Sequence, residues 1–465
     1  LGHKFRKTLE PTINPPETTP PPGPRRVPLR PVLKASGDLL LGYSGGPGSA
    51  LLLDLVHESY FTPAQLDPAR GTRQKSKREK VWPNARVAFV DVSAAYPGTP
   101  DRTDDARRLV EQYPYFEFIP LRIEQSFDPE WASSVGFSLN DTALGADLRS
   151  EDLPTSSTPF TTPTSSLLSY LAAQPSTSAR ATALRTLTRL LLQHTAHQTQ
   201  SSHLLLGTSL ASHAVGLLDA VAHGAGFAIR QVAEETWRGV RIVRPLREIA
   251  DKEVAAGVWW RRVAVMPATV GVPEEVGITR LTKGKQPPFL CVGIGAKGVF
   301  TDRGCGMESD FITGLDRNYP STVHTIARTC DKVESKGGMT QTLCPLCERP
   351  VQPDIQAWKA QIAIRAFGPG STSSTTAADD APRPPPFGSL PSATGPTSAT
   401  PATHPKLSTL TPSLCYACHT QLTSRGRTVA PLSSVEAGAV TLPVWVGPNL
   451  VKMRRPDVSE YILED

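Results

Sequence analysis

Two cysteine pairs have the spacing of metal-binding turns. Cys344 and Cys347 flank Pro-Leu, and Cys415 and Cys418 flank Tyr-Ala. Each C-x-x-C turn can direct two thiolates at one ion, so the two pairs predict a tetrahedral, structural zinc site. The segment between the pairs is long, but the entropic cost of closing a loop grows only logarithmically with its length.

Other roles for these thiols are less consistent with two pairs. A redox-active pair and free thiols are the alternatives to zinc. The second pair followed by His419 also matches a c-type haem attachment, which requires an export signal that the sequence does not show. Cys291 and Cys305 lie in an aperiodic stretch and receive no role, and Cys330 is predicted to be a small buried residue.

A glycine-rich segment, SGGPGS (44–49), lies between an apolar run and a helical pattern. Its glycines let backbone N–H groups approach an oxyanion, and the following helix adds its positive N-terminus. It is neither a Walker loop nor the Rossmann G-x-G-x-x-G motif. It predicts an anion- or nucleotide-binding loop, with a plain connecting turn as the alternative. The residues that would hold the anion are Ser44, Gly45, Gly46, Gly48 and Ser49.

Apolar runs and helical periodicities alternate through residues 37–274. Strands are predicted over 38–43, 86–92, 115–121, 203–209, 227–231 and 240–243. Helices are predicted over 49–61, 101–112, 181–199, 211–224 and 246–258. This alternation indicates a parallel sheet with helices on both faces. The predicted fold class is therefore α/β with a Rossmann-like parallel sheet.

Composition divides the chain into folded parts and long insertions. Residues 153–180 and 369–413 are rich in Ser, Thr and Pro, and we expect them to be disordered because they bury too little apolar surface. Residues 275–310 form an atypical insertion that we place outside the fold. The expected parts are a basic, Pro-rich segment (1–36, with an extended linker over 11–31), the α/β domain (37–274) and a C-terminal zinc-ribbon-like module (311–465).

Overall composition excludes several classes of protein. Lys and Arg number 49 against 43 Asp and Glu, so the net charge of +6 permits a polyanionic partner without requiring one. No apolar run approaches the ~18–20 residues of a membrane span. Seven cysteines are too few for a disulfide scaffold. We expect a soluble protein that does not bind membranes, and the missing initiator Met suggests a fragment.

The strand–SGGxxS–helix arrangement resembles the PP-loop of the N-type ATP pyrophosphatase superfamily, which has an adenine nucleotide alpha-hydrolase-like fold. Members adenylate a carbonyl oxygen and release pyrophosphate. Their loop carries a carboxylate, often preceded by Lys, where this chain has Gly48 and Pro47. A later superfamily motif matches residues 207–213 without its acidic pair. Because carboxylates are natural Mg²⁺ ligands, we do not expect this chain alone to use ATP and Mg²⁺.

The order of further motifs resembles the cytoplasmic tRNA 2-thiolation protein 2 family, the second subunit of the eukaryotic wobble-uridine thiolation complex. The matching segments are His3–Lys7, Arg244–Arg247 with Lys252-Glu253, Phe311–Val333, CPLC, CYAC and the end of the chain from Met453. The resemblance implies a cytoplasmic heterodimer whose other subunit carries an intact PP-loop and the catalytic cysteines. That complex takes sulfur from a thiocarboxylated ubiquitin-related modifier and thiolates the tRNAs for Lys, Glu and Gln.

The resemblance also implies that this chain is required but has no catalytic residue. No cysteine lies between Gly37 and Leu290, so the α/β domain has no sulfur-carrying nucleophile. Lys4, Arg6 and Lys7 are candidate tRNA contacts, and the basic run 70–80 fits either phosphate contact or a solvated loop. Two alternatives are an active ATP-dependent tRNA sulfurtransferase and a zinc-ribbon interaction protein. A role in protein urmylation is a further implication of the family.

Overall fold

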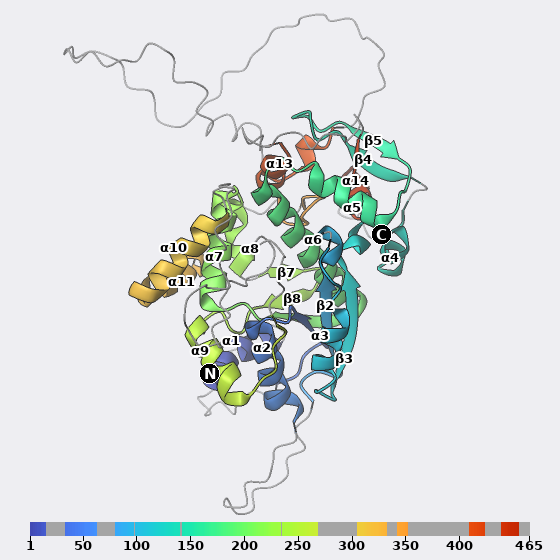
Figure 1. Ribbon diagram of the computed structural model, residues 1–465. Coiled ribbons are helices and arrows are strands. Elements are labelled where there is room, and N and C mark those ends of the chain that lie inside the picture. The colour runs from blue at the N-terminus through green and yellow to red at the C-terminus, as the bar shows by residue number, and fades with distance from the viewer. Residues whose placement is uncertain are drawn as a thin grey trace, which may run out of the picture.

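The protein consists of a six-stranded sheet flanked by helices, with a second, three-stranded sheet near the C-terminal helices (Figure 1). The computed structural model describes residues 1–14, 33–62, 80–96, 98–139, 142–233, 235–267, 305–332, 342–351, 409–423 and 439–454. Within these ranges, no helix is both long and apolar enough to span a bilayer.

The large sheet has the strand order β3-β2-β1-β6-β8-β7. Its strands are β1 (Asp38–Tyr43), β2 (Ala85–Asp91), β3 (Phe116–Arg122), β6 (Ser201–Leu206), β7 (Glu235–Trp237) and β8 (Val240–Val243). β1 runs parallel to both neighbours, with Leu41 opposite Val87 on one side and Leu205 on the other. Only β7 is antiparallel to its neighbour. The predicted parallel, Rossmann-like sheet is confirmed.

Helices cover both faces of this sheet because successive side chains of each strand point to opposite sides. Leu39 and Leu41 of β1 pack in one core, and Leu40 packs in another. The first core includes residues of α2 (Pro47–Val56), α3 (Thr103–Val110) and α9 (Asp251–Arg261). The second includes Leu192 and Ala196 of α6 (Thr177–Gln198). α2 continues into a π-helical turn over His57–Phe61.

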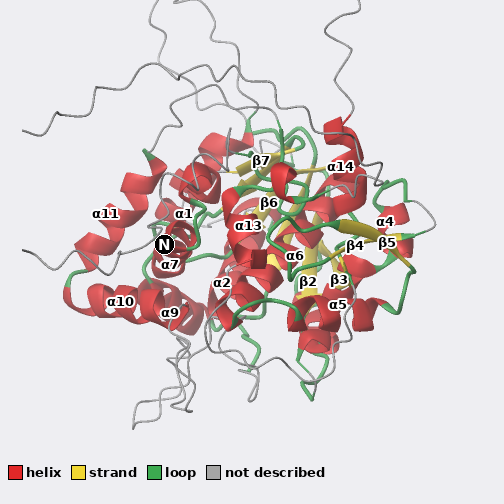
Figure 2. Ribbon diagram, turned by 90° about the horizontal axis from the view of Figure 1, so that it is seen from above, coloured by secondary structure: helices red, strands yellow, loops and turns green. Residues whose placement is uncertain are grey.

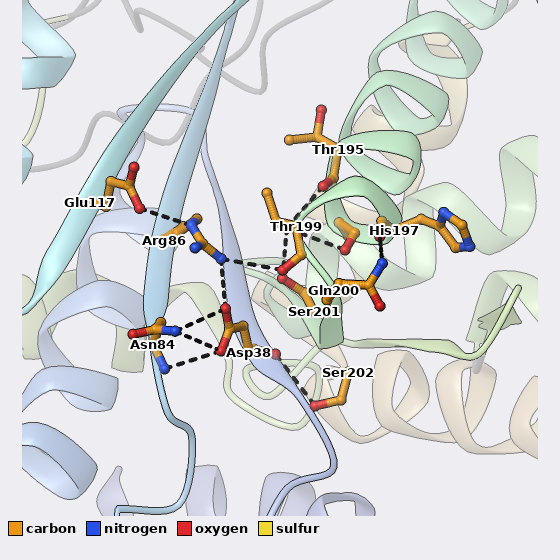
Figure 3. A network of polar contacts seen from close by, with 11 residues as sticks. Asp38, Asn84, Arg86, Glu117, Thr195, His197, Thr199, Gln200, Ser201 and Ser202 are labelled. Carbon is orange, nitrogen blue, oxygen red and sulfur yellow. Dashed lines mark hydrogen bonds and ion pairs between the residues drawn. The ribbon is translucent and has the colours of Figure 1, made fainter. Parts of the chain in front are cut away.

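Ion pairs fix the amino-terminal edge of the sheet, where β1, β2 and β3 begin (Figure 3). Arg86 Nη1 lies 2.7 Å from Asp38 Oδ2, and Arg86 Nε lies 2.8 Å from Glu117 Oε2. The same Nη1 donates to the carbonyl of Thr199, just before β6, at 3.3 Å. One guanidinium thus ties three strands and the end of α6 at the edge opposite the glycine-rich loop.

The N-terminal residues are helical and part of the core. α1 (Gly2–Ile13) buries Phe5, Leu9 and Ile13, which are spaced four residues apart and therefore share one face. The expected linker over 11–31 overlaps the end of this helix, and residues 15–32 lie outside the described part.

Two predicted ranges are wrong. Residues 153–180 are not a disordered insertion, because they contain β5 (Thr155–Thr158), α5 (Pro163–Ala172) and the start of α6. The Ser and Thr residues serve as helix caps: Thr162 accepts from the N–H of Ser165, and Ser176 from that of Ala179. The strand predicted at 227–231 is instead a 3₁₀ turn and α8 (Ile229–Ala233).

The C-terminal residues share a core with the middle of the chain rather than folding by themselves. β4 (Ala143–Ala146) pairs with β5 and with β9 (Val440–Thr441). The same core holds Tyr170 of α5 and Trp445, which directly precedes α14 (Val446–Arg454). The structure thus differs from the expected separate module over 311–465. α4 (Pro129–Ser134) and α13 (Tyr416–Thr423) complete this region.

Two further helices lie on the other side of the molecule, as the view from above shows (Figure 2). α10 (Cys305–Asn318) and α11 (Pro320–Asp331) pack against α7 (Leu210–Ala222). The last residues of the expected insertion 275–310 therefore belong to α10. Residues 275–304, 369–408 and the basic run except Lys80 lie outside the described part of the chain.

Candidate functional site

The four predicted zinc ligands come together in the fold. The Sγ atoms of Cys344, Cys347, Cys415 and Cys418 all lie within 4.8 Å of one another. The Sγ atoms of Cys347 and Cys415 lie 3.6 Å apart. Zn–S bonds of about 2.3 Å in a tetrahedron place the sulfurs about 3.8 Å apart. The spacing of this group therefore suits a single tetrahedral ion, and the four cysteines could hold a metal.

Each cysteine pair is shaped by local backbone hydrogen bonds. The N–H of Cys344 donates to the carbonyl of Arg349 at 2.7 Å, and the N–H of Glu348 donates to the carbonyl of Cys344 at 2.8 Å. Glu348 adopts a left-handed backbone with φ of 53°. The second pair begins α13, whose positive N-terminal dipole favours thiolates.

The crowded thiols cannot all ionise without a cation. Hydrogen bonds from Cys344, and then from Cys415 and Cys418, lower the pKa of Cys347 well below its usual value. Hydrogen bonds with Cys344 and Cys347 raise the pKa of Cys415 well above it. One thiolate is thus stabilised by protonated neighbours, and a bound cation is what lets all four become thiolates.

Three largely buried arginines near the cysteines carry charge that can offset a metal centre. Arg189 Nη1 lies 2.5 Å from Glu235 Oε1, and Arg189 Nη2 donates to the carbonyl of Cys347. Arg349 Nη2 lies 3.9 Å from Glu235 Oε2. Burial and the charges of Arg349 and Arg189 lower the pKa of Arg244 to about 10.

These three guanidinium groups and Glu235 together carry two positive charges in excess. Four thiolates around one divalent ion carry two negative charges, and buried charge is costly unless it is compensated. The electrostatics of the surroundings therefore fit a divalent ion held by the four cysteines.

Glu348 is a structural residue that the sequence did not reveal. Its buried carboxylate accepts from Trp237 Nε1 at 2.8 Å and from Asn449 Nδ2 at 2.7 Å, and it lies 3.4 Å from Arg238 Nη2. Burial raises its pKa, but His194, whose Nε2 lies 3.4 Å from the carboxylate, and the charge of Arg238 outweigh this and lower the pKa to about 2. The carboxylate thus fastens the first cysteine pair to the edge of the sheet and to α14.

Glu348→Ala is expected to lower the free energy of unfolding by about 3–5 kcal/mol, because it leaves buried donors and a guanidinium without their acceptor. Urea denaturation would measure the loss. Glu130→Ala, at an exposed position in α4, is the control and should leave the midpoint nearly unchanged. Equal midpoints for both variants would contradict the anchoring role.

A cleft of about 200 Å³ opens beside the cysteine group. It lies between α6, α7 and α13, and Cys347 and Cys415 form part of its wall. One side of the group therefore faces this cleft, while the other side packs in the core.

The glycine-rich loop follows β1 at the point where the sheet order changes direction between β1 and β6, a typical ligand position in open α/β sheets. The Ser44 and Ser49 hydroxyl oxygens lie 3.2 Å apart, and the Ser49 hydroxyl donates to the Gly46 carbonyl at 2.9 Å. The predicted anion-binding hydroxyls are thus bonded within the loop itself.

The surroundings of the loop are also filled by the chain. The N–H of Met266 donates to the Gly45 carbonyl at 3.0 Å, and a Cβ on Gly45 would lie 2.1 Å from Met266 Sδ. A Cβ on Gly48 would lie 2.2 Å from the Gly207 carbonyl oxygen. Glycine is therefore needed at both positions to pack the loop against its own neighbours.

The three candidate tRNA contacts all lie on α1. Lys4 Nζ is 2.8 Å from Glu253 Oε1, so this lysine joins α1 to α9. Arg6 and Lys7 are exposed.

Comparison with known proteins agrees with this arrangement. The family model described as cytoplasmic tRNA 2-thiolation protein 2 matches residues 307–420, a range that includes all four cysteines. A relative of that name from Drosophila persimilis is 25% identical over 329 residues, covering 70% of this chain and 67% of the relative. Another from Phaeosphaeria nodorum is 30% identical over 200 residues, covering 41% of this chain and 48% of the relative.

The chain is similar to the cytoplasmic tRNA 2-thiolation protein 2 family, both in the family-model match and in the relatives of that name. The family predicted from the order of motifs is thereby confirmed. Among solved structures, the U34-tRNA thiolase NcsA from Methanococcus maripaludis aligns with a TM-score of 0.40 and 15% identity, over 78% of this chain and 87% of that one.

Proposed function

We propose that the chain is the non-catalytic but required subunit of a cytoplasmic, heterodimeric tRNA sulfurtransferase. The complex would thiolate carbon 2 of the wobble uridine in the tRNAs for Lys, Glu and Gln. Similarity to the family supports the role in tRNA thiolation. The observation that supports the non-catalytic assignment is the glycine-rich loop, which is closed upon itself.

A catalytic PP-loop must hold the phosphates of ATP and place Mg²⁺ beside them. Here Pro47 and Gly48 supply neither cation nor carboxylate. The serine hydroxyls bond within the loop, and Met266 packs against Gly45. Mg²⁺ requires hard oxygen ligands that this loop does not offer. The partner subunit, with an intact PP-loop, would therefore bind ATP and activate the uridine.

The proposed metal is a single structural zinc ion. Four cysteine ligands leave no position for water or substrate, so such a site stabilises structure rather than performing catalysis. Its ligands come from two segments that both pack beside α6. The ion would therefore hold the C-terminal residues on the α/β domain, and the thiols that bind it would not carry sulfur.

The partners follow from the family role. The chain would bind the catalytic subunit and tRNA, and the complex would receive sulfur from the thiocarboxylated ubiquitin-related modifier. Arg6 and Lys7 are free to meet phosphate from the surface of α1, whereas Lys4 is held by Glu253. The same complex would support protein urmylation.

Reconstitution tests the proposal. The chain and its partner are expressed separately and together, and thiolation of an unmodified tRNA for Lys is measured with ATP, Mg²⁺ and the thiocarboxylated modifier. We expect thiolation only when both chains are present. Mixing this chain with a partner whose PP-loop is inactivated should give thiolation only at the background rate.

Two alternatives give different results in this assay. An active PP-loop enzyme would release pyrophosphate and thiolate tRNA without the partner, and the closed loop would then have to open for ATP. A zinc-ribbon interaction protein would contain zinc but would neither retain tRNA nor change the partner's thiolation rate.

A further inference from the structure

The outward face of α9 carries two adjacent tryptophans. Trp259 is 58% exposed and Trp260 is 80% exposed, the largest value among the exposed large apolar side chains described. Ala256 and Lys252 are exposed on the same side, one and two turns earlier, respectively. The inward face packs Gly257 against Leu51. α9 lies at the periphery of the structure in both ribbon views (Figures 1 and 2).

The two indole rings are available to a ligand. Their centroids are 6.1 Å apart and their planes meet at 56°, so neither ring covers the face of the other. A single exposed apolar side chain is ordinary, but neighbouring large ones often mark an interaction site. Tryptophan faces also attract cations and stack on planar groups.

The charges around the tryptophans favour an anionic partner. Lys252 and Arg262 are exposed, and neither forms an ion pair with another residue in the described ranges. Three nearby acids are already engaged. Asp54 and Glu58 pair with Arg261, and Glu253 pairs with Lys4. Lys252 and Arg262 therefore remain available to a partner, whereas these three carboxylates do not.

Arg262 occupies a position that favours glycine. It ends α9 with φ of 54° and ψ of 38°, and the next N–H, of Val263, donates to the Val258 carbonyl at 3.0 Å. Helices commonly end on glycine in this left-handed conformation, which other residues adopt at a cost. A cation near a helix C-terminus gains some stability from the dipole. The left-handed backbone of Arg262 is nonetheless strained. This residue lies beside the exposed rings, where an arginine side chain can reach a ligand.

We propose that Trp259 and Trp260 form a stacking platform for an unpaired RNA base, with Lys252 and Arg262 contacting the adjoining phosphates. The assignment rests on the proposed function, since it names a surface by which this subunit would hold tRNA. Aromatic faces accept any base, so the platform contributes affinity for single-stranded RNA rather than sequence recognition. A protein partner on the same face is the competing occupant.

The test uses the full chain in complex with its partner subunit. Two RNA probes are compared by fluorescence anisotropy at fixed salt: the unmodified anticodon stem-loop of the tRNA for Lys, and a fully paired duplex of equal length. Trp260→Ala should weaken stem-loop binding by about 5- to 150-fold, the range for loss of one stacked base, and leave duplex binding nearly unchanged. Stem-loop binding should also quench the tryptophan fluorescence of the unaltered complex more than that of the variant.

Arg262→Gly separates a binding role from a structural one. Glycine relieves the left-handed strain, so the thermal midpoint should stay the same or rise. The stem-loop affinity should nevertheless fall, and the slope of log K against log salt should decrease by about 0.7–0.9. An arginine that only caps the helix would show neither change in RNA binding.

Tyr115→Ala is the control, since this tyrosine is 46% exposed and precedes β3 rather than lying on α9. Its RNA affinity should match that of the unaltered complex. If Trp260→Ala binds the stem-loop as tightly as the unaltered complex does, the platform is overturned. It is also overturned if the variant loses the partner subunit but retains RNA binding, because this face would then be a protein-docking surface. Failure of the unaltered complex to thiolate tRNA would instead refute the proposed function.

Discussion

Replacing Cys344 with serine is expected to abolish stoichiometric metal binding and unfold the region around the four cysteines. The serine removes one of four ligands that lie within 4.8 Å of one another. Structural zinc binding contributes about 10–16 kcal/mol in small zinc-finger peptides, comparable to the entire ~5–15 kcal/mol stability of a domain. Metal analysis should find one zinc per unaltered chain, and the variant should have a markedly lower thermal midpoint.

The control for this prediction is Cys330→Ser, which changes a cysteine of α11 that belongs to neither C-x-x-C pair. It should retain one zinc. Chelation of the unaltered protein should reproduce the effect of Cys344→Ser, because the cleft gives access to one side of the group. A Cys344→Ser protein with full metal content would show that the four cysteines do not bind one ion. Iron together with visible absorption in the unaltered protein would show that the centre is an iron–sulfur cluster and not zinc.

Arg189→Met is expected to lower the free energy of unfolding by about 3–5 kcal/mol, the usual cost of removing one partner from a buried ion pair. The substitution leaves Glu235 with Arg349 at 3.9 Å and the donor Gln193 Nε2 at 2.9 Å, and it removes the donor to the Cys347 carbonyl. It also removes positive charge that offsets the thiolates, so zinc retention should fall. Urea denaturation and zinc release to a colorimetric chelator would measure the two effects.

A double-mutant cycle tests whether Arg189 acts through Glu235. The pair Arg189→Met with Glu235→Leu should lose less stability than the sum of the single changes, because no buried carboxylate is left unpaired. Arg108→Met is the control, since Arg108 is 73% exposed in its pair with Asp105, and surface pairs contribute only about 0–1 kcal/mol. Additive losses in the cycle would contradict the coupling.

The large sheet was predictable because its strands are short apolar runs separated by helical periodicities. The runs at Leu39–Leu41 and Leu204–Leu205 are buried on both faces, as parallel strands require. The prediction was wrong for residues 153–180, whose Ser-, Thr- and Pro-rich composition indicated disorder. Leu167, Tyr170 and Leu171 have helical spacing there, and the surrounding Ser and Thr cap the helices instead of breaking them.

The candidate site was predictable only where local spacing carries the chemistry. The two C-x-x-C turns are recognisable in the sequence from the spacing of their cysteines, and the structure brings them together. The residues that surround them have no such local signal: Arg189 meets the carbonyl of Cys347, and Glu348 meets Trp237 and Asn449, from distant parts of the chain. Only the tertiary fold creates those contacts. Likewise, the glycines of the loop were evident, but the packing of Met266 against Gly45 was not.

The pairing of β4 with β9 has a consequence for how the chain is made. Ala146 pairs with Val440, so a strand from the first third of the protein finds its partner only near the end. During synthesis, the ribosome releases β4, β5 and α5 long before the residues that cover them exist, and such long-range pairing is slow. Until translation is almost complete, Leu153 and Tyr170 have no C-terminal cover. A nascent chain interrupted before residue 439 would expose this apolar surface to chaperones and proteases.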